Sequence, residues 1–203
     1  MTLSRLVLWR HGETEHNAAG RMQGHFDSLL TDTGWNQARF AVPALARFEP
    51  VLVVASDLRR AMDTATVFSE ASGVPLRIDK RLRETHLGAW QGLTADEVDA
   101  DWPGARLIWQ HDPTYAPPEG ETKIEVAARA SEVVAGLDGE LDGTVLLCTH
   151  GGLINALIAH LLELPIELSP RLAGHGNCHW SVLSRRRTET QWRLSVYNAG
   201  ITG

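Results

Sequence analysis

Residues 6–14 read Leu6-Val7-Leu8-Trp9-Arg10-His11-Gly12-Glu13-Thr14, so four apolar residues run directly into a polar corner. A short apolar run that ends at polar residues and a glycine is typical of a buried strand. We expect this strand over residues 5–9, which places Arg10 and His11 at its carboxyl end. Open parallel α/β sheets bind ligands at that end of their strands. Gly12, which has no side chain, would let the backbone approach a bound group closely.

The rest of the chain alternates between patterns typical of strands and of helices. Continuous apolar, β-branched runs such as 51–55 predict strands that are buried on both faces, and residues suited to helix caps, such as Thr31, precede the helical patterns. Pro43 should kink or break the first long helix. Further strands are expected at 76–79, 144–148, 178–183 and 191–197, a hairpin turn at 185–188, helices at 31–47, 58–71, 94–101, 105–111, 121–137 and 153–162, and loops at 15–28 and 112–120.

This order of elements predicts an α/β fold. Strands that alternate with helices form a mainly parallel sheet flanked by helices on both faces. The closing hairpin adds one antiparallel strand near the C-terminus. The length of 203 residues suits a single domain spanning 1–203. Within it, we expect the helices and loops at about 94–122 to form an excursion over the site at the strand ends.

Composition excludes several classes of protein. The hydrophobic and charged fractions, 43% and 22%, are those of a globular chain. The net charge of -6 argues against nucleic-acid binding, although a local arginine cluster can still bind an anionic substrate. No apolar run approaches the roughly 20 residues that span a bilayer, and no signal-peptide pattern is present. The two cysteines, Cys148 and Cys178, are too few for a disulfide framework. We therefore expect a cytoplasmic protein without nucleic-acid or membrane partners.

Three of the predicted strands end in similar polar corners. These corners are Arg10-His11-Gly12, Ser56-Asp57-Leu58-Arg59-Arg60 and Thr149-His150-Gly151-Gly152. Because the carboxyl ends of parallel strands share one edge of a sheet, two histidines and at least two arginines should converge there, beside helix N-termini. Helix N-termini favour anions, and the arginine fork matches phosphate oxygens. The sequence therefore predicts a phosphate site.

His11 is the expected nucleophile at this site. Nearby arginines disfavour the imidazolium and should lower the pKa of His11, which leaves a neutral ring with a free lone pair. His150 would donate to the phosphoryl oxygens as charge moves onto them. Glu84 would be protonated beside a bound dianion, donate that proton to the leaving alkoxide and later activate water. The scheme requires no metal or other cofactor, because arginine and histidine supply the positive charge.

The corner at residues 10–14 resembles the signature of the histidine phosphatase superfamily, which includes the cofactor-dependent phosphoglycerate mutases. Further motifs fit this family, in order, along nearly the whole chain. They are Asn17 with Gly20-Arg21-Met22-Gln23-Gly24, Leu30-Thr31 with Gly34 and Gln37-Ala38, Ser56-Asp57-Leu58 with Arg60-Ala61 and Thr64-Ala65, Leu82-Arg83-Glu84 with Gly88-Ala89-Trp90-Gln91-Gly92, Gly120-Glu121-Thr122 and Thr149-His150-Gly151-Gly152.

The resemblance implies a role for each matching residue. His11 would be the phosphorylated nucleophile and Glu84 the proton donor. The implied substrate-binding residues are Arg10, Asn17, Gln23, Arg60, His150 and Gly151, of which Arg10, Arg60 and His150 also take part in catalysis. Arg60 is preferred over Arg59 because it directly precedes Ala61, as in the family pattern.

Two departures from the mutase branch favour a phosphatase. The mutase motif typically reads Glu-Arg-His-Tyr-Gly, whereas Glu84 is followed by Thr85-His86-Leu87-Gly88, and the long mutase insertion is reduced to residues 112–120. Stretches such as Pro103-Gly104-Ala105-Arg106-Leu107 and Trp192-Arg193-Leu194 are similar to the actinobacterial glucosyl-3-phosphoglycerate phosphatases. That similarity implies a small phosphorylated metabolite, glucosyl-3-phosphoglycerate, as the substrate, and a place in methylglucose lipopolysaccharide biosynthesis.

The sequence leaves other functions open. The alternatives are a phosphoglycerate mutase, a broad-specificity acid or sugar phosphatase and, from another class, a silent binding module that has kept the fold. The silent module is disfavoured because every proposed catalytic residue is present. The segment Gly174-His175-Gly176-Asn177-Cys178-His179 has no common metal-ligand spacing, so no metal is expected. The resemblance also allows a homodimer, since relatives of this size commonly dimerise.

Overall fold

The computed structural model describes residues 2–186 and 188–201. Within these residues one six-stranded sheet has the strand order β3-β2-β4-β1-β5-β6. Its strands are β1 (Leu3–Arg10), β2 (Pro50–Ala55), β3 (Leu76–Ile78), β4 (Gly143–Thr149), β5 (Trp180–Ser184) and β6 (Arg193–Ala199). The α-helices are α1 (Glu15–Ala18), α2 (Asp32–Ala46), α3 (Arg59–Ser72), α4 (Ala95–Asp101), α5 (Ala105–His111), α6 (Lys123–Glu140) and α7 (Gly151–Leu161), and short 3-10 helices are η1 (Lys80–Leu82), η2 (Gly88–Trp90) and η3 (Ile166–Arg171).

The sheet is parallel except at one strand. β1 pairs in parallel with β4, β4 with β2, and β2 with β3. β5 runs antiparallel to both of its neighbours, β1 and β6. The predicted mainly parallel α/β sheet with one antiparallel strand near the C-terminus is therefore confirmed. The hairpin turn expected at 185–188 includes residue 187, which lies outside the described residues.

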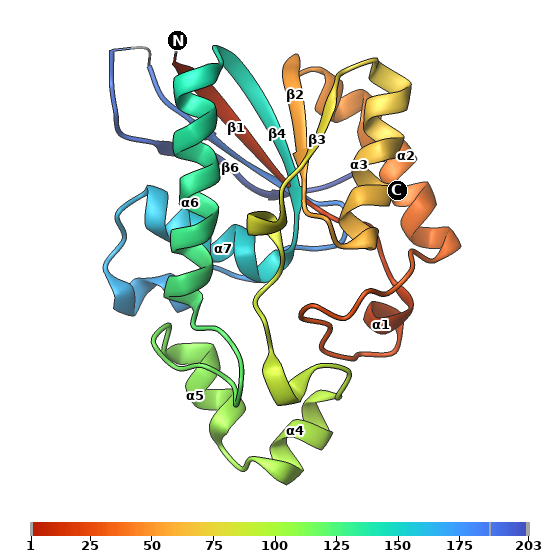
Figure 1. Cartoon of the computed structure of the whole chain (residues 1–203), viewed down its shortest axis with the longest axis vertical. Helices are drawn as coiled ribbons and strands as arrows, with labels where there is room; N and C mark the ends of the chain where they lie inside the picture. The colour runs from red at the N-terminus through yellow and green to blue at the C-terminus, as the bar shows by residue number, and fades with distance from the viewer. Residues whose placement is uncertain (1, 187, 202–203) are drawn as a thin grey trace.

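Side chains alternate along β1 between two apolar cores. Leu6 and Leu8 pack with residues of α6 and α7 on one face of the sheet. Val7 and Trp9 pack with residues of α2 and α3 on the other face. Figure 1 shows the sheet between these two helical layers. Burial on both faces explains why the central strands appear in the sequence as continuous apolar runs.

Side-chain caps and one glycine set the ends of the long helices. Thr31 accepts the N–H of Gly34 at the start of α2. Thr122 and Glu125 form a reciprocal capping box at the start of α6. Gly73, in the left-handed conformation with φ 73°, ends α3. These are the local signals from which the helices could be predicted.

Two local predictions differ from the structure. Residues 15–28, expected as a loop, begin with α1, because Thr14 and Asn17 form a capping box that closes one helical turn. Pro43 was predicted to kink or break the first long helix, and α2 continues through it, so the helix is not broken there. Pro43 is exposed, so water can bind the carbonyl that the missing N–H leaves unpaired.

The segment between β3 and α6 builds a small cluster of its own. Leu87, Trp90 and Val98 are buried in it. Trp90 contacts the rings of Trp102 and Trp109, at centroid distances of 6.4 and 5.9 Å. Figure 1 shows α4 and α5, which belong to this segment, beyond the carboxyl ends of the central strands. The aromatic packing therefore holds this part of the chain together outside the two main cores.

Candidate active site

The polar corners that follow β1, β2 and β4 are neighbours, because β4 lies between the other two strands. Arg10 is paired with Thr149, and the N–H of His11 donates to the Thr149 carbonyl at 2.9 Å. On the other side of β4, the N–H of Ser56 donates to the Cys148 carbonyl at 3.1 Å. The sheet thus brings the three corners together along one edge, as the sequence predicts.

Gly12 seats the His11 corner against α2 and α3. A Cβ on Gly12 would lie only 2.6 Å from the carbonyl oxygen of Gly34, at the start of α2. The N–H of Gly12 donates to Thr64 Oγ1 of α3 at 3.0 Å. A side chain at position 12 would therefore push the corner away from the helices that support it.

His11 is buried, with its Nδ1 2.7 Å from the carbonyl oxygen of Gly12. Because a carbonyl oxygen can only accept, Nδ1 carries the proton and Nε2 keeps a lone pair. Burial is the largest cause that lowers the pKa of His11 well below 6.5, and the charges of Arg60 and Arg10 add to it. The sequence predicts a neutral His11 from the arginines alone, whereas burial contributes more.

The ring of His150 lies next to that of His11, and neither of its nitrogens has a hydrogen-bond partner among the described residues. The two ring centroids are 5.2 Å apart, and both ring nitrogens of His150 are buried and unpaired. The Nε atoms of Arg10 and Arg60 are also buried without a partner. Buried polar groups are almost always hydrogen-bonded, so this cluster is arranged to receive acceptor atoms from a ligand.

The two adjacent arginines at the start of α3 lie in different surroundings. Arg60 is fully buried and donates to the carbonyls of Phe26 and Gly24, at 2.7 and 2.8 Å. Burial lowers the pKa of Arg60 to about 10, a value at which the guanidinium still keeps its charge at neutral pH. Arg59 is exposed and pairs with Asp63. Only Arg60 therefore lies in the buried cluster.

Arg10 is held by a different segment of the chain from Arg60. Its Nη1 donates to the carbonyl of His175 at 2.5 Å. The backbone of Gly151 lies against it, since a Cβ there would be 3.4 Å from Arg10 Nε. Burial lowers the pKa of Arg10, and the charge of Glu84 opposes that effect. Arg10 thus lies against Gly151, and the charge of Glu84 acts on both Arg10 and Arg60.

The carboxylate of Glu84 binds the N-terminus of α7. Its Oε2 accepts the N–H of Gly152 at 3.0 Å, and its Oε1 accepts those of Leu153 and Thr85, at 3.0 and 2.8 Å. Three backbone N–H groups thus hold the Glu84 carboxyl group at the first turn of α7. The predicted acid therefore lies beside the His150 corner, from which α7 begins.

The amide oxygens of Asn17 and Gln23 are both occupied by other groups of the protein. Asn17 Oδ1 accepts from Thr14 N and from Asn177 Nδ2, at 3.2 and 3.1 Å. Asn177 Nδ2 also lies 3.3 Å from the carbonyl of His11. Gln23 Oε1 accepts from Thr14 Oγ1 at 3.0 Å. Asn17 is thus linked to His11 through Asn177, and Gln23 joins the same network through Thr14.

Several supporting residues have no role in the sequence prediction. They are Thr64, Glu121, Arg129, His175 and Asn177. Most of them bind backbone atoms, and such contacts leave no pattern of spacing. Thr64 and Glu121 fall in the family-like motifs Thr64-Ala65 and Gly120-Glu121-Thr122, which gave positions but no roles. In the part of the chain that the structure describes, no three His, Cys, Asp or Glu side chains gather as metal ligands.

Sequence comparison places this arrangement among known proteins. The model of the histidine phosphatase superfamily (branch 1) matches residues 6–200. The chain is 47% identical to the glucosyl-3-phosphoglycerate phosphatase of Mycobacterium tuberculosis, over 98% of its own length and 96% of the relative's. It is 31% identical to a probable phosphoglycerate mutase GpmB of Photorhabdus laumondii, over 83% and 79% of the two chains.

Solved structures agree with the sequence comparison. The mycobacterial glucosyl-3-phosphoglycerate phosphatase in complex with VO3 aligns with a TM-score of 0.92 and 50% identity, over 97% of this chain and all (100%) of that one. YhfR of Bacillus stearothermophilus aligns with a TM-score of 0.87 and 32% identity, over 98% of both chains. With a family model that covers residues 6–200, relatives that align over nearly the full length and the paired histidine corners at one sheet edge, the chain belongs to the histidine phosphatase superfamily.

Proposed function

We propose that this protein is a phosphomonoesterase that acts through a phosphohistidine. The Nε2 lone pair of His11 forms a bond to phosphorus while the bond from phosphorus to the substrate oxygen breaks. Glu84 transfers its proton to that oxygen, and the alcohol leaves. The Gly12 carbonyl, which accepts from Nδ1, stabilises the positive charge that develops on the ring. Water then attacks phosphorus, gives a proton to the Glu84 carboxylate and frees His11 and inorganic phosphate.

The observation that carries this proposal is the set of unpaired buried groups around His11. The Nε atoms of Arg10 and Arg60 and the ring nitrogens of His150 have no partner among the described residues. A phosphoryl group supplies several acceptor oxygens at once. Guanidinium groups bind them with charge-assisted hydrogen bonds, and such preorganised donors stabilise the charge of the transition state. In this role Arg10, Arg60, His150 and Gly151 form the phosphate pocket, with Asn17 and Gln23 beside it.

We propose glucosyl-3-phosphoglycerate as the substrate. Relatives at 47% identity over nearly the whole chain are named for this activity. A cavity of about 730 Å³ adjoins the site, from Thr85 and Gly152 to Trp109, Lys123 and Asn155. It offers room for an alcohol part much larger than phosphate, together with an aromatic ring and a cation. The excursion at 94–122, which carries Trp109, would then roof the substrate within a single domain spanning 1–203.

We propose a cytoplasmic homodimer that acts in methylglucose lipopolysaccharide biosynthesis, without nucleic-acid or membrane partners. The net charge of -6 argues against nucleic-acid partners. The two buried free thiols, Cys148 and Cys178, are typical of proteins in a reducing compartment. No helix in the described part of the chain is long and apolar enough to cross a bilayer. Light scattering on the purified protein tests the homodimer.

Phosphate release tests the activity. Glucosyl-3-phosphoglycerate, 3-phosphoglycerate and p-nitrophenyl phosphate are compared with and without EDTA. We expect hydrolysis both with and without EDTA, and the highest kcat/KM for glucosyl-3-phosphoglycerate. Release from none of the three contradicts a phosphatase. Conversion of 3- to 2-phosphoglycerate, primed by the bisphosphate, identifies a mutase instead.

Variants test the intermediate. His11→Ala should abolish turnover and the acid-labile, alkali-stable phosphoryl label that phosphohistidine gives. Arg59→Ala, which changes an exposed side chain at the same edge, is the control and should keep both. A His11→Ala protein with full turnover contradicts the proposed nucleophile.

A further inference from the structure

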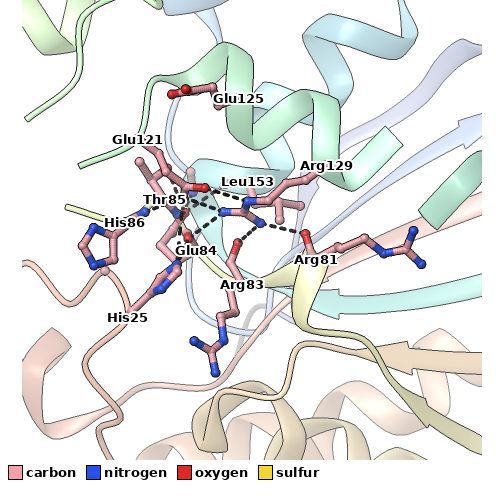
Figure 2. Close-up of polar contacts among 12 residues, drawn as sticks. His25, Arg81, Arg83, Glu84, Thr85, His86, Glu121, Glu125, Arg129 and Leu153 are labelled. Carbon is pink, nitrogen blue, oxygen red and sulfur yellow. Dashed lines mark hydrogen bonds and ion pairs between the residues drawn. The ribbon is translucent and has the colours of Figure 1, made fainter. Parts of the chain in front are cut away.

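A guanidinium from α6 holds the backbone that carries Glu84. Arg129 Nη1 donates to the carbonyls of Arg81 and Arg83, each at 2.7 Å, and Nη2 donates to the carbonyl of Glu84 at 2.8 Å. Figure 2 shows these three carbonyls around one guanidinium. Residues 81–84 have no strand partner of their own, because β3 ends at Ile78. The side chain of Arg129 therefore replaces the backbone pairing that a strand would have.

The other donors of the same guanidinium bind Glu121. Arg129 Nε donates to Glu121 Oε1 at 3.0 Å, and Nη2 donates to Oε2 at 2.9 Å. With the three carbonyls, all five N–H donors of Arg129 are used. Burial raises the pKa of Glu121, but the Arg129 and His86 hydrogen bonds outweigh it and the pKa is lowered. Glu121 is thus a charged partner that fixes the plane of the guanidinium.

Glu121 also binds the backbone that follows Glu84. Its Oε2 accepts the N–H of His86 at 2.8 Å, and its own N–H donates to the His86 carbonyl at 2.8 Å. His25 Nε2 lies 2.8 Å from the Glu84 carbonyl, which therefore accepts from two side chains (Figure 2). The backbone is held before, at and after Glu84 by groups from distant parts of the sequence.

We infer that Arg129, with Glu121, is a positioning residue that sets the carboxyl group of Glu84 against the phosphoryl site. The inference rests on the proposed function, in which Glu84 is the acid. Arg129 does not touch the reacting atoms, because its donors are all used on Glu121 and the backbone. It acts through the main chain of Glu84, whose carboxylate reaches the start of α7. A displacement of about 1 Å at such a group costs on the order of 100-fold in rate.

A comparison of two substrates with different leaving groups distinguishes this role from general support of the fold. An alkoxide needs a proton as it departs, whereas p-nitrophenolate is a far weaker base and departs without one. We therefore measure the first-turnover release of alcohol from glucosyl-3-phosphoglycerate and from p-nitrophenyl phosphate. Arg129→Gln should slow the first by about 10- to 100-fold and the second by no more than about threefold. Arg129→Lys, which keeps one charged donor group, should fall between Arg129→Gln and the unmodified chain.

Two controls make the result decisive. Glu84→Gln should slow the alkyl ester selectively; if it slows both esters equally, the acid assignment of the proposed function fails. Arg77→Gln removes another arginine that binds α6, through Glu140 at 2.9 Å, and should leave the ratio of the two rates unchanged. Selective loss in Glu84→Gln without selective loss in Arg129→Gln overturns the inference. If Arg129→Gln does not fold, Glu121→Gln, which keeps the shape of the partner, decides by the same ratio.

Discussion

Glu84 Oε2 accepts the backbone N–H of Gly152 at 3.0 Å, so the proposed acid rests on the first turn of α7. A Cβ on Gly152 would lie 2.6 Å from Glu84 Oε1. The nearest obstacle is the end of a flexible side chain and not backbone, so the carboxyl group can move aside. The glycine is therefore required by the position of the acid more than by the helix.

Gly152→Ala should lower activity without lowering stability. The new methyl group displaces the Glu84 carboxyl group, so we expect kcat/KM on alkyl phosphates to fall by about tenfold or more. Alanine is the better helix former by up to about 1 kcal/mol, so the free energy of unfolding should stay level or rise. Steady-state kinetics and urea unfolding measure the two effects.

Gly136→Ala is the matched control. Gly136 lies in α6 with open space around it, so the same substitution should raise stability and leave activity unchanged. Equal activity of Gly152→Ala and the unmodified chain would show that Glu84 does not need its place on α7.

The main elements of the sheet could be predicted because burial on two faces leaves a visible pattern. β2 and β4 are continuous apolar runs, and the polar corner after each run marks where the strand stops. Pro43 and α1 could not be predicted in the same way. The continuation of α2 through Pro43 depends on which side of the helix faces water. The formation of α1 depends on a capping box in a single turn.

The site residues that could be predicted are reactive side chains that directly follow a strand. His11 and His150 follow strands, so the topology of the sheet alone brings them together. Arg129 is different, because it lies 45 residues from Glu84 and binds its carbonyl. Backbone carbonyls are the same in every residue, so nothing in the sequence of 81–84 shows which side chain binds them.

Substitution of Arg60 should lower kcat/KM far more than substitution of Arg59. Arg60→Lys keeps a charge but loses the fork that reaches the Gly24 and Phe26 carbonyls and the phosphoryl group. We expect a loss of kcat/KM on the order of 100-fold, the usual effect of removing one preorganised donor. Arg59→Lys should stay within about twofold, because its side chain is exposed. Kinetics with p-nitrophenyl phosphate measure both; similar losses in the two variants would contradict the placement of Arg60, and not Arg59, in the phosphate pocket.

Stability should fall as the pH falls below 6.5. The pKa values of His11 and His150 are lowered well below 6.5 by burial, and burial lowers that of His175 to about 4. Between pH 6.5 and 5 the unfolded chain therefore binds protons that the folded chain does not. Each of these histidines adds a slope of up to about 1.4 kcal/mol per pH unit, with folding favoured at the higher pH.

Urea unfolding at pH 7, 6 and 5, in buffers free of phosphate, measures this slope. Phosphate is left out because it would bind the folded state and raise its stability. In His175→Asn the slope should be smaller, since one of the three buried histidines is gone. A free energy of unfolding that stays level from pH 7 to 5 is incompatible with three neutral buried histidines.

Lys123 should affect the choice of substrate and not the chemical step. Its Nζ donates to the carbonyls of Trp109 and Gln110, at 2.6 and 3.1 Å, and lies 4.9 Å from the Trp109 ring centroid, on the wall of the cavity. Lys123→Met should raise KM for glucosyl-3-phosphoglycerate by about tenfold, the effect of losing one charge-assisted contact. KM for p-nitrophenyl phosphate should stay within about twofold, because this small ester does not extend into the cavity. Lys80→Met changes the other lysine of the chain, which is exposed, and should alter neither value. Equal changes in KM for both esters would place the alcohol part of the substrate outside this cavity.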